Sequence, residues 1–183
     1  AEDILLEALE IAEKKMDLAG EKKEYIDVII QDVALIFNNL GVLYDKMRWY
    51  DEATNVYRTS AEVYEELLED YPRHFEMLAP KLALSIQNLI GMYINAGKIP
   101  TTEDTYEAPH RIIEICEELV RRKPEKYITN LGNAYLLAGR FYRHQQQPHE
   151  ALNYFQKSLE IRERKASENR IYLPDLRWAL FNL

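Results

Sequence analysis

The sequence predicts an all-α fold, a solenoid of antiparallel helix pairs that stack on one another. The 183 residues include only six glycines and seven prolines, so long uninterrupted helices are possible. Apolar residues recur at spacings of three and four, which is the period of a helix with one buried face. A short block of sequence also returns at a constant interval, which is typical of repeat proteins.

The repeated block marks the first helix of each pair. It runs over 39–44 as NLGVLY, returns over 88–93 as NLIGMY and returns in weaker form over 137–142 as LAGRFY, with 49 positions between equivalent residues. A fourth copy begins at 181–183. An interval of this length has room for two helices of five to six turns each and their connections.

A second apolar stripe follows the first and third blocks. Ala53 and Tyr57 lie four residues apart after the first block, and Ala151 and Phe155 do the same after the third. Pro148 precedes the latter pair, and a proline in the first turn of a helix loses no hydrogen bond. Each unit is therefore helix, short turn, helix, and we expect helices over residues 2–19, 23–47, 50–70, 74–97, 109–123, 125–146, 149–168 and 172–183.

The middle unit fits this pattern least well. After Gly97 it continues with polar residues and prolines as far as Pro109. A proline inside a helix costs about 3 kcal/mol. We therefore expect the second helix of this unit to start late, with Pro109 in its first turn and an irregular loop or one short turn before it.

These residues resemble the tetratricopeptide repeat family, in its long-helix bacterial variant. The family pattern is a Leu-Gly-x-x-Tyr block on the first helix and an alanine followed four residues later by an aromatic on the second, and the matching residues are Leu40, Gly41, Tyr44, Ala53 and Tyr57, then Gly139, Tyr142, Ala151 and Phe155. The usual repeat has about 34 residues, so the helices here are longer. The resemblance covers most of the chain.

The resemblance implies a right-handed α-α superhelix. We expect one repeat domain over 1–183, with a partial unit at each end, and the expected units are 1–20 (partial), about 23–72, 73–123, 124–170 and 171–183 (partial). In an array of this kind the stacked units create an extended concave face on which ligands lie.

Composition excludes several classes of function. The net charge of −8 disfavours nucleic acid, because a nucleic-acid binder needs a concentrated basic surface. Cys116 is the single cysteine, which excludes an internal disulfide and favours a reducing, cytoplasmic compartment. No apolar run approaches the ~20 residues needed to cross a bilayer. The chain lacks an initiator methionine and a leader, so we expect an excised piece or a processed product.

The resemblance places the binding groove along the first helix of each pair. The implied groove residues are Asn38, Asn39, Asp45 and Lys46 in the first unit, Gln87, Asn88 and Asn95 in the second, and Arg140, Arg143 and His144 in the third. Asn39, Asn88 and Asn182 occupy equivalent positions, so a partial ladder of amides could bind a peptide backbone. The alternative is that these amides cap or bridge neighbouring helices.

The third unit differs in charge from the first two. Arg140, Arg143 and His144 are about one turn apart and could offer a cationic patch to an acidic ligand. The alternative is a solvated helix end. Members of the family that clamp a terminal carboxylate use groove lysines, and Asn38 and Gln87 stand at those positions, which disfavours that activity.

No residue set predicts catalysis, a cofactor or a metal site. The four histidines show no pair at one-turn spacing, and no phosphate loop, nucleophile elbow or dinucleotide fingerprint is present. The sequence therefore predicts a non-catalytic scaffold that binds a protein or peptide. The alternatives are self-association into a homo-oligomer, through uncapped apolar residues of the terminal helices such as Trp178, Leu180 and Phe181, and a regulatory sensor domain of a larger protein.

Overall fold

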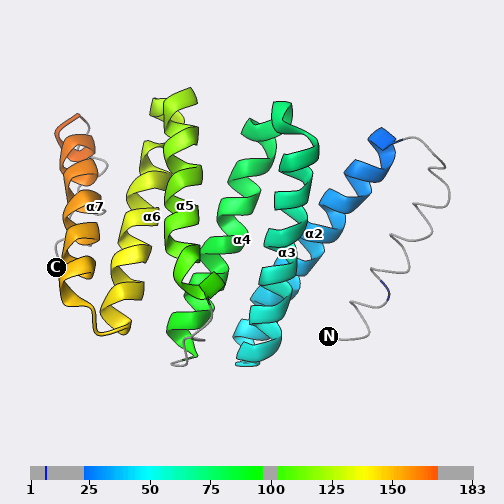
Figure 1. The fold of residues 1–183 in the computed structure, drawn as a ribbon, viewed down its shortest axis with the longest axis horizontal. Coiled ribbons are helices and arrows are strands. Elements are labelled where there is room, and N and C mark those ends of the chain that lie inside the picture. The colour runs from blue at the N-terminus through cyan, green and yellow to red at the C-terminus, as the bar shows by residue number, and fades with distance from the viewer. Residues whose placement is uncertain (1–6, 8–22, 97–102, 169–183) are drawn as a thin grey trace. The chain divides into compact units, whose positions relative to one another are not determined.

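The computed structural model describes residue 7 and residues 23–96 and 103–168, and every regular element within them is helical. The elements are α2 (Lys23–Lys46), α3 (Tyr50–Asp70), the short 3-10 helix η1 (Pro72–His74), α4 (Phe75–Asn95), α5 (Glu103–Arg122), α6 (Pro124–His144) and α7 (Pro148–Glu168) (Figure 1). The all-α prediction is confirmed. Apart from residue 7, the expected helices over 2–19 and 172–183 lie outside the described residues.

Five expected helices agree with the structure to within two residues at each end, and the sixth does not. We expected a helix over 109–123, whereas α5 begins at Glu103 and contains Pro109 in its second turn. Ala108 and Pro109 are buried, and the ring of Tyr106 meets the ring of Phe141 on α6 edge-on at 6.4 Å. These apolar contacts offset the hydrogen bond that the proline cannot donate, so the prediction of a late start was wrong.

The chain divides into two compact units, Ala1–Met92 and Tyr93–Leu183. In the first, α2 and α3 form an antiparallel pair joined by a three-residue turn, and α4 is hydrogen-bonded to both. The Ser60 hydroxyl links all three helices, because its oxygen lies 2.8 Å from the Ala34 carbonyl oxygen on α2 and 2.8 Å from the Ser85 hydroxyl on α4. A hydroxyl at this buried crossing allows the helices to approach closely without leaving a polar atom unpaired.

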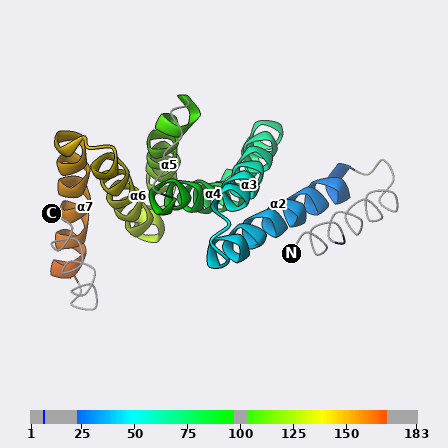
Figure 2. The same ribbon diagram turned by 90° about the horizontal axis from the view of Figure 1, so that it is seen from below.

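The second unit is built from α5, α6 and α7, which pack in chain order. The helices α6 and α7 lie side by side in both views (Figures 1 and 2). The Ser158 hydroxyl on α7 donates to the Gly132 carbonyl on α6 at 2.7 Å, and Phe141 in the last turn of α6 is fully buried. Buried apolar side chains on the facing sides of these helices form the core, as the spacing of three and four predicts.

The pairs α2–α3 and α6–α7 repeat the same contacts at positions 98 residues apart. The bond from Ser60 to Ala34 corresponds to the bond from Ser158 to Gly132. Gly41 on α2 lies under the ring of Tyr57, and Gly139 on α6 lies under the ring of Phe155. Since 98 is twice the 49-residue interval, the periodicity in the sequence is a periodicity of contacts.

The turns between these paired helices also match. Arg48 and Gln146, 98 residues apart, both have a positive φ, at 60° and 59°. In each turn the following residue donates its backbone N–H to the carbonyl of the tyrosine in the repeated block, from Trp49 to Tyr44 and from Gln147 to Tyr142, both at 2.9 Å. A left-handed residue closes a helix and reverses the chain within three residues.

Candidate functional site

Two first helices, α2 and α4, lie next to each other in the first unit. Lys81 on α4 donates to the Gln31 side-chain oxygen on α2 at 3.1 Å, and the Asn88 amide donates to the Asn38 side-chain oxygen at 3.0 Å. Both bonds join residues 50 positions apart, and the numbering rises in the same direction on both helices. The helices α2 and α4 are therefore parallel neighbours, as stacked repeats require.

The amides of Asn38 and Asn88 form a bridge between α2 and α4. Asn38 is buried, with 6% of its surface exposed, and Asn88 is half-buried. The described contact therefore corresponds to the alternative in which amides join neighbouring helices. Asn39 is exposed on α2, and Asn182 lies outside the described residues. A role for any of these amides in binding stays a prediction.

Six large apolar side chains are exposed on α2 and α4, and five of them recur at regular intervals, the sixth being Leu43 at 36%. Val28, Leu35 and Val42 follow one another at intervals of seven on α2, with 56%, 47% and 39% of their surfaces exposed. Met77 and Leu84 on α4 are each 46% exposed, and they lie 49 residues after Val28 and Leu35. The recurring residues thus occupy equivalent positions of two consecutive repeats.

These five residues share one side of the unit. On α2, Leu35 and Val42 come four residues after Gln31 and Asn38, the residues that point toward α4. On α4, Met77 and Leu84 come four residues before Lys81 and Asn88, which point toward α2. Residues four apart are neighbours on a helix surface. On two parallel helices that lie side by side, the residue four after an interface residue on one and the residue four before an interface residue on the other point to the same side of the pair. We call Val28, Leu35, Val42, Met77 and Leu84 the apolar face.

Polar groove candidates of the first unit lie three or four residues from members of the apolar face. Asn39, Lys46 and Gln87 are exposed, and Asn95, also exposed, belongs to the second unit. Asp45 is half-buried, and its carboxylate contributes, after burial itself, to raising the pKa of Tyr57 to about 12. An apolar centre with a polar border is the usual composition of a protein-binding surface.

Sequence reasoning missed the apolar face because periodicity assigned the apolar residues of these helices to the core. The signal was available in the sequence. A helix with one buried stripe does not need a second apolar residue every seventh position, and α2 has one at 28, 35 and 42. Recurrence at 77 and 84, one repeat later, would have marked the positions as a surface shared by two helices.

The helix α6, which is the first helix of the pair α6–α7 in the second unit, is polar at the equivalent positions. Lys126, Asn133 and Arg140 replace the apolar residues there. Arg143 and His144 are exposed, and the Arg143 guanidinium lies 5.4 Å from the centre of the Phe155 ring on α7. The structure therefore places part of the predicted cationic patch against an aromatic ring. Whether the patch binds an acidic ligand stays a prediction.

A cluster of aromatic rings joins α5, α6 and α7. Tyr142 and Tyr154 stack with ring centres 5.4 Å apart, and Tyr135 stacks on Tyr154 at 6.3 Å. His110 on α5 lies between two phenol oxygens, with Nε2 2.8 Å from that of Tyr142 and Nδ1 3.5 Å from that of Tyr154. Lys157 lies over the rings of Tyr135 and Tyr154, at 5.4 and 5.5 Å. The cluster packs three helices together, as expected for tyrosines at helical spacing.

The described residues offer no group of three histidine, cysteine or acidic side chains that could hold a metal ion. Cys116 is buried, as expected, and burial followed by the nearby Glu117 carboxylate raises the pKa of its thiol to about 12. A thiol with so high a pKa is a weak nucleophile at neutral pH. Across the same described residues, no helix has the length and apolar character needed to span a membrane.

Comparison with known families adds an independent result. The model of a tetratricopeptide repeat matches residues 33–76 and 131–169, which cover most of α2 with α3 and most of α6 with α7. No match was found among curated proteins. The two matched segments start 98 residues apart, which is the offset at which the contacts of the helix pairs repeat. Two segments of the chain are therefore similar to the tetratricopeptide repeat, one in each of its two units.

Proposed function

We propose that this chain is a non-catalytic scaffold that binds a partner protein or peptide on its first helices, and that the apolar face is the contact surface of the first unit. Tetratricopeptide repeats generally mediate interactions between proteins. The observation that carries the proposal is the exposure of Val28, Leu35, Val42, Met77 and Leu84 at equivalent positions of two repeats.

The physical reason is the cost of leaving such a surface in water. Removing apolar area from water is favourable by about 25 cal/mol per Å², and only what exceeds the entropy cost of association contributes to affinity. Scattered exposed apolar residues are ordinary, but a contiguous group with a polar border marks an interaction site. Asn39, Lys46 and Gln87 supply that border with both donors and acceptors.

The experiment compares two variants in affinity capture from the native host. The double variant Leu35→Ser with Leu84→Ser removes apolar area from the centre of the face. Leu152→Ser is the matched control, because Leu152 is equally exposed at 44% but lies on α7, in the other unit. Partners captured by the wild-type chain and the control, and lost by the double variant, would support the proposal.

Equal capture by all three chains would contradict the proposal. Circular dichroism of each variant separates lost binding from lost folding, and the sites chosen are exposed, so each substitution is expected to change stability by less than about 0.5 kcal/mol. A candidate partner identified in this way is then titrated against the purified chains, where the double variant is expected to bind at least tenfold more weakly.

Self-association is the second candidate, because the same apolar face could cover its equivalent on another copy. Light scattering over increasing protein concentration distinguishes the two functions. A dimer that dissociates in the Leu35→Ser and Leu84→Ser variant would assign the face to self-association. A monomer at high concentration would assign it to a different protein. We also propose a cytoplasmic location, without nucleic acid as a ligand, on the basis of the acidic composition and the single cysteine.

A further inference from the structure

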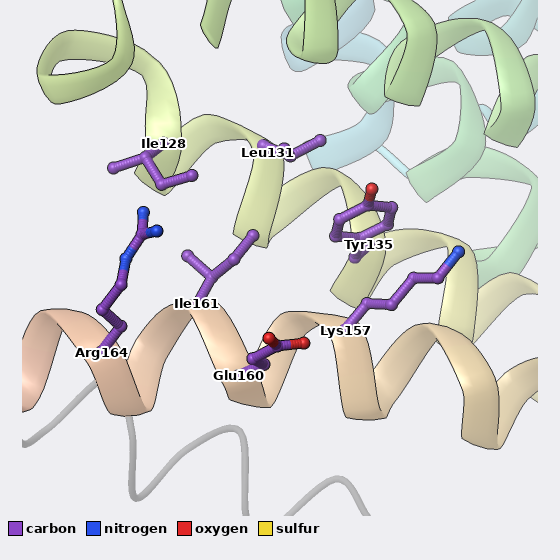
Figure 3. A pocket seen from close by; sticks show the side chains of 7 residues that line it. All are labelled: Ile128, Leu131, Tyr135, Lys157, Glu160, Ile161 and Arg164. Atoms are coloured by element: carbon purple, nitrogen blue, oxygen red, sulfur yellow. The ribbon is translucent and has the colours of Figure 1, made fainter.

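A pocket of about 380 Å³ lies between α6 and α7 in the second unit (Figure 3). Its floor is aliphatic and consists of Ile128 and Leu131 from α6 and Ile161 from α7. The side chain of Ile161 points toward Leu131. The apolar face belongs to the first unit, so this pocket is a separate site. Its volume is in the range of pockets that bind small molecules or single side chains of a peptide.

Two cations stand at the ends of the pocket. Lys157 extends toward Tyr135, and Arg164 extends toward Ile128 (Figure 3). The Lys157 ammonium is 5.4 Å from the ring centre of Tyr135 and 5.5 Å from that of Tyr154, which limits the positions it can adopt. The two cations are seven residues apart on α7, so they share one side of the helix and their backbones are about 10.5 Å apart.

One carboxylate lies between the cations. Glu160 lines the pocket three residues after Lys157 and four before Arg164. The Arg164 guanidinium is also 3.8 Å from the Glu168 carboxylate, but both side chains of that pair are more than half exposed, so the pair contributes little. Along α7 the rim therefore presents a cation, an anion and a second cation above an aliphatic floor.

We propose that this pocket binds a short extended peptide in which an apolar side chain lies between two carboxylates at alternate positions. Alternate residues of an extended chain point to the same side, and positions i and i+4 are about 13 Å apart. Side chains as long as lysine and arginine can reach carboxylates at that separation. The apolar side chain at i+2 then lies on the floor, and the Glu160 carboxylate accepts a backbone N–H of the peptide.

The negative net charge of the protein limits where an acidic peptide can bind. The chain carries a net charge of −8, so an acidic peptide is repelled by the protein as a whole and is attracted only where cations converge. The inference does not depend on the proposed function of the first unit, since it concerns other helices and other residues.

The test uses the whole chain and a fluorescein-labelled peptide of sequence Gly-Ser-Glu-Ser-Leu-Ser-Glu-Ser-Gly, followed by fluorescence anisotropy up to about 1 mM protein. Saturable binding that weakens with added salt is expected. Peptides with lysine in place of both glutamates, or with serine in place of leucine, are expected to bind at least tenfold more weakly. Equal binding of the serine peptide would overturn the proposal, because the floor would then contribute nothing.

Variants of the chain locate the site. Lys157→Met and Arg164→Met are each expected to weaken binding about tenfold, whereas Lys157→Arg keeps the charge and is expected to bind within twofold of the wild type. Arg121→Met is the matched control, because Arg121 is an exposed cation of α5 outside the pocket. Leu35→Ser with Leu84→Ser is expected to bind normally. No binding by the wild-type chain, or equal losses in Lys157→Met and Arg121→Met, would overturn the proposal.

Discussion

Two glycines show how closely the paired helices approach. A Cβ added at Gly41 would lie 2.5 Å from the nearest ring carbon of Tyr57, and one added at Gly139 would lie 2.5 Å from a ring carbon of Phe155. Both rings are buried, so they cannot move aside freely. Glycine is required at these positions for space and not for backbone conformation.

We expect Gly41→Ala to lower the free energy of unfolding by about 1–3 kcal/mol, because the ring of Tyr57 must shift within a packed core. Urea denaturation measures the change. Gly91→Ala is the matched control, since no described atom outside its own helix lies within 4 Å of the added Cβ. There the gain in helix propensity is expected to stabilise the chain by about 0.5–1 kcal/mol. Equal effects of the two substitutions would show that the ring does not constrain Gly41.

The amide pair of Asn38 and Asn88 gives a second prediction at this scale. Asn88→Ala leaves the buried Asn38 amide without the partner described here, and we expect a loss of about 1–2 kcal/mol in unfolding free energy. Asn39→Ala, at an exposed neighbour, is expected to change stability by less than about 0.5 kcal/mol. Urea denaturation compares the two variants, and equal stability of both would contradict the prediction. Binding tests of an amide ladder should therefore use Asn39→Ala alone, because Asn88→Ala also affects folding.

Among the described elements, the turns between paired helices contain the two non-glycine residues with a positive φ. Arg48 and Gln146 have the left-handed backbone conformation that costs a non-glycine residue about 1–2 kcal/mol. We expect Arg48→Gly to raise the free energy of unfolding by about 0.5–1 kcal/mol, because the relief exceeds the added entropy of the unfolded chain.

The control for the turn is Glu62→Gly, at an exposed position inside α3, which is expected to destabilise by about 1 kcal/mol. Thermal unfolding of the two variants should shift Tm in opposite directions. A fall in Tm for both would contradict the assignment of strain to Arg48.

The helices were predicted well where the spacing of apolar residues agreed with the residues that begin or end a helix. The turn before Tyr50 and the proline at the start of α7 set the helix bounds, and the structure has both. The start of α5 was missed because local propensity at Pro109 was given more weight than burial of the same residue. Tertiary packing decided the outcome, and packing partners such as Phe141 cannot be read from the segment itself.

The candidate site was predicted less well than the helices. Family resemblance predicted a groove along the first helices and named polar side chains as its residues, and both stay predictions. The contact from Asn88 to Asn38 shows that a polar residue on that helix can be structural. Leu35 and Leu84 were overlooked because a leucine in an amphipathic helix is normally assigned to the core. Whether such a leucine is exposed depends on where the neighbouring helix lies, and the spacing of apolar residues within one helix does not give that position.

At the scale of the whole molecule, buried tyrosines predict how stability depends on alkaline pH. Burial is the main cause that raises the pKa of Tyr57, Tyr64 and Tyr142 from 10.0 to about 12. Between pH 10 and 12 the folded chain keeps these phenol protons while the unfolded chain releases them. Their contribution to stability is therefore full below pH 10 and is lost as the pH rises through 12.

We expect the absorbance of tyrosinate to appear in two stages on titration with base. Exposed tyrosines ionise near pH 10, and the buried ones ionise only as the helical signal in circular dichroism disappears above about pH 11. A chain already unfolded in urea should titrate in one stage. A single stage in the folded chain as well would show that the buried phenols are accessible to solvent.

Because the turns at Arg48 and Gln146 have the same backbone conformation, the helix that precedes the first turn could be joined directly to the helix that follows the second. Removing residues 48–145 would connect Met47 to Gln146 with the same backbone geometry on both sides of the cut. The ring of Phe155 would then cover Gly41, and the Ser158 hydroxyl would meet the Ala34 carbonyl. Loss or gain of whole double repeats at this joint is thus a simple route by which such a protein can change length without redesigning its core.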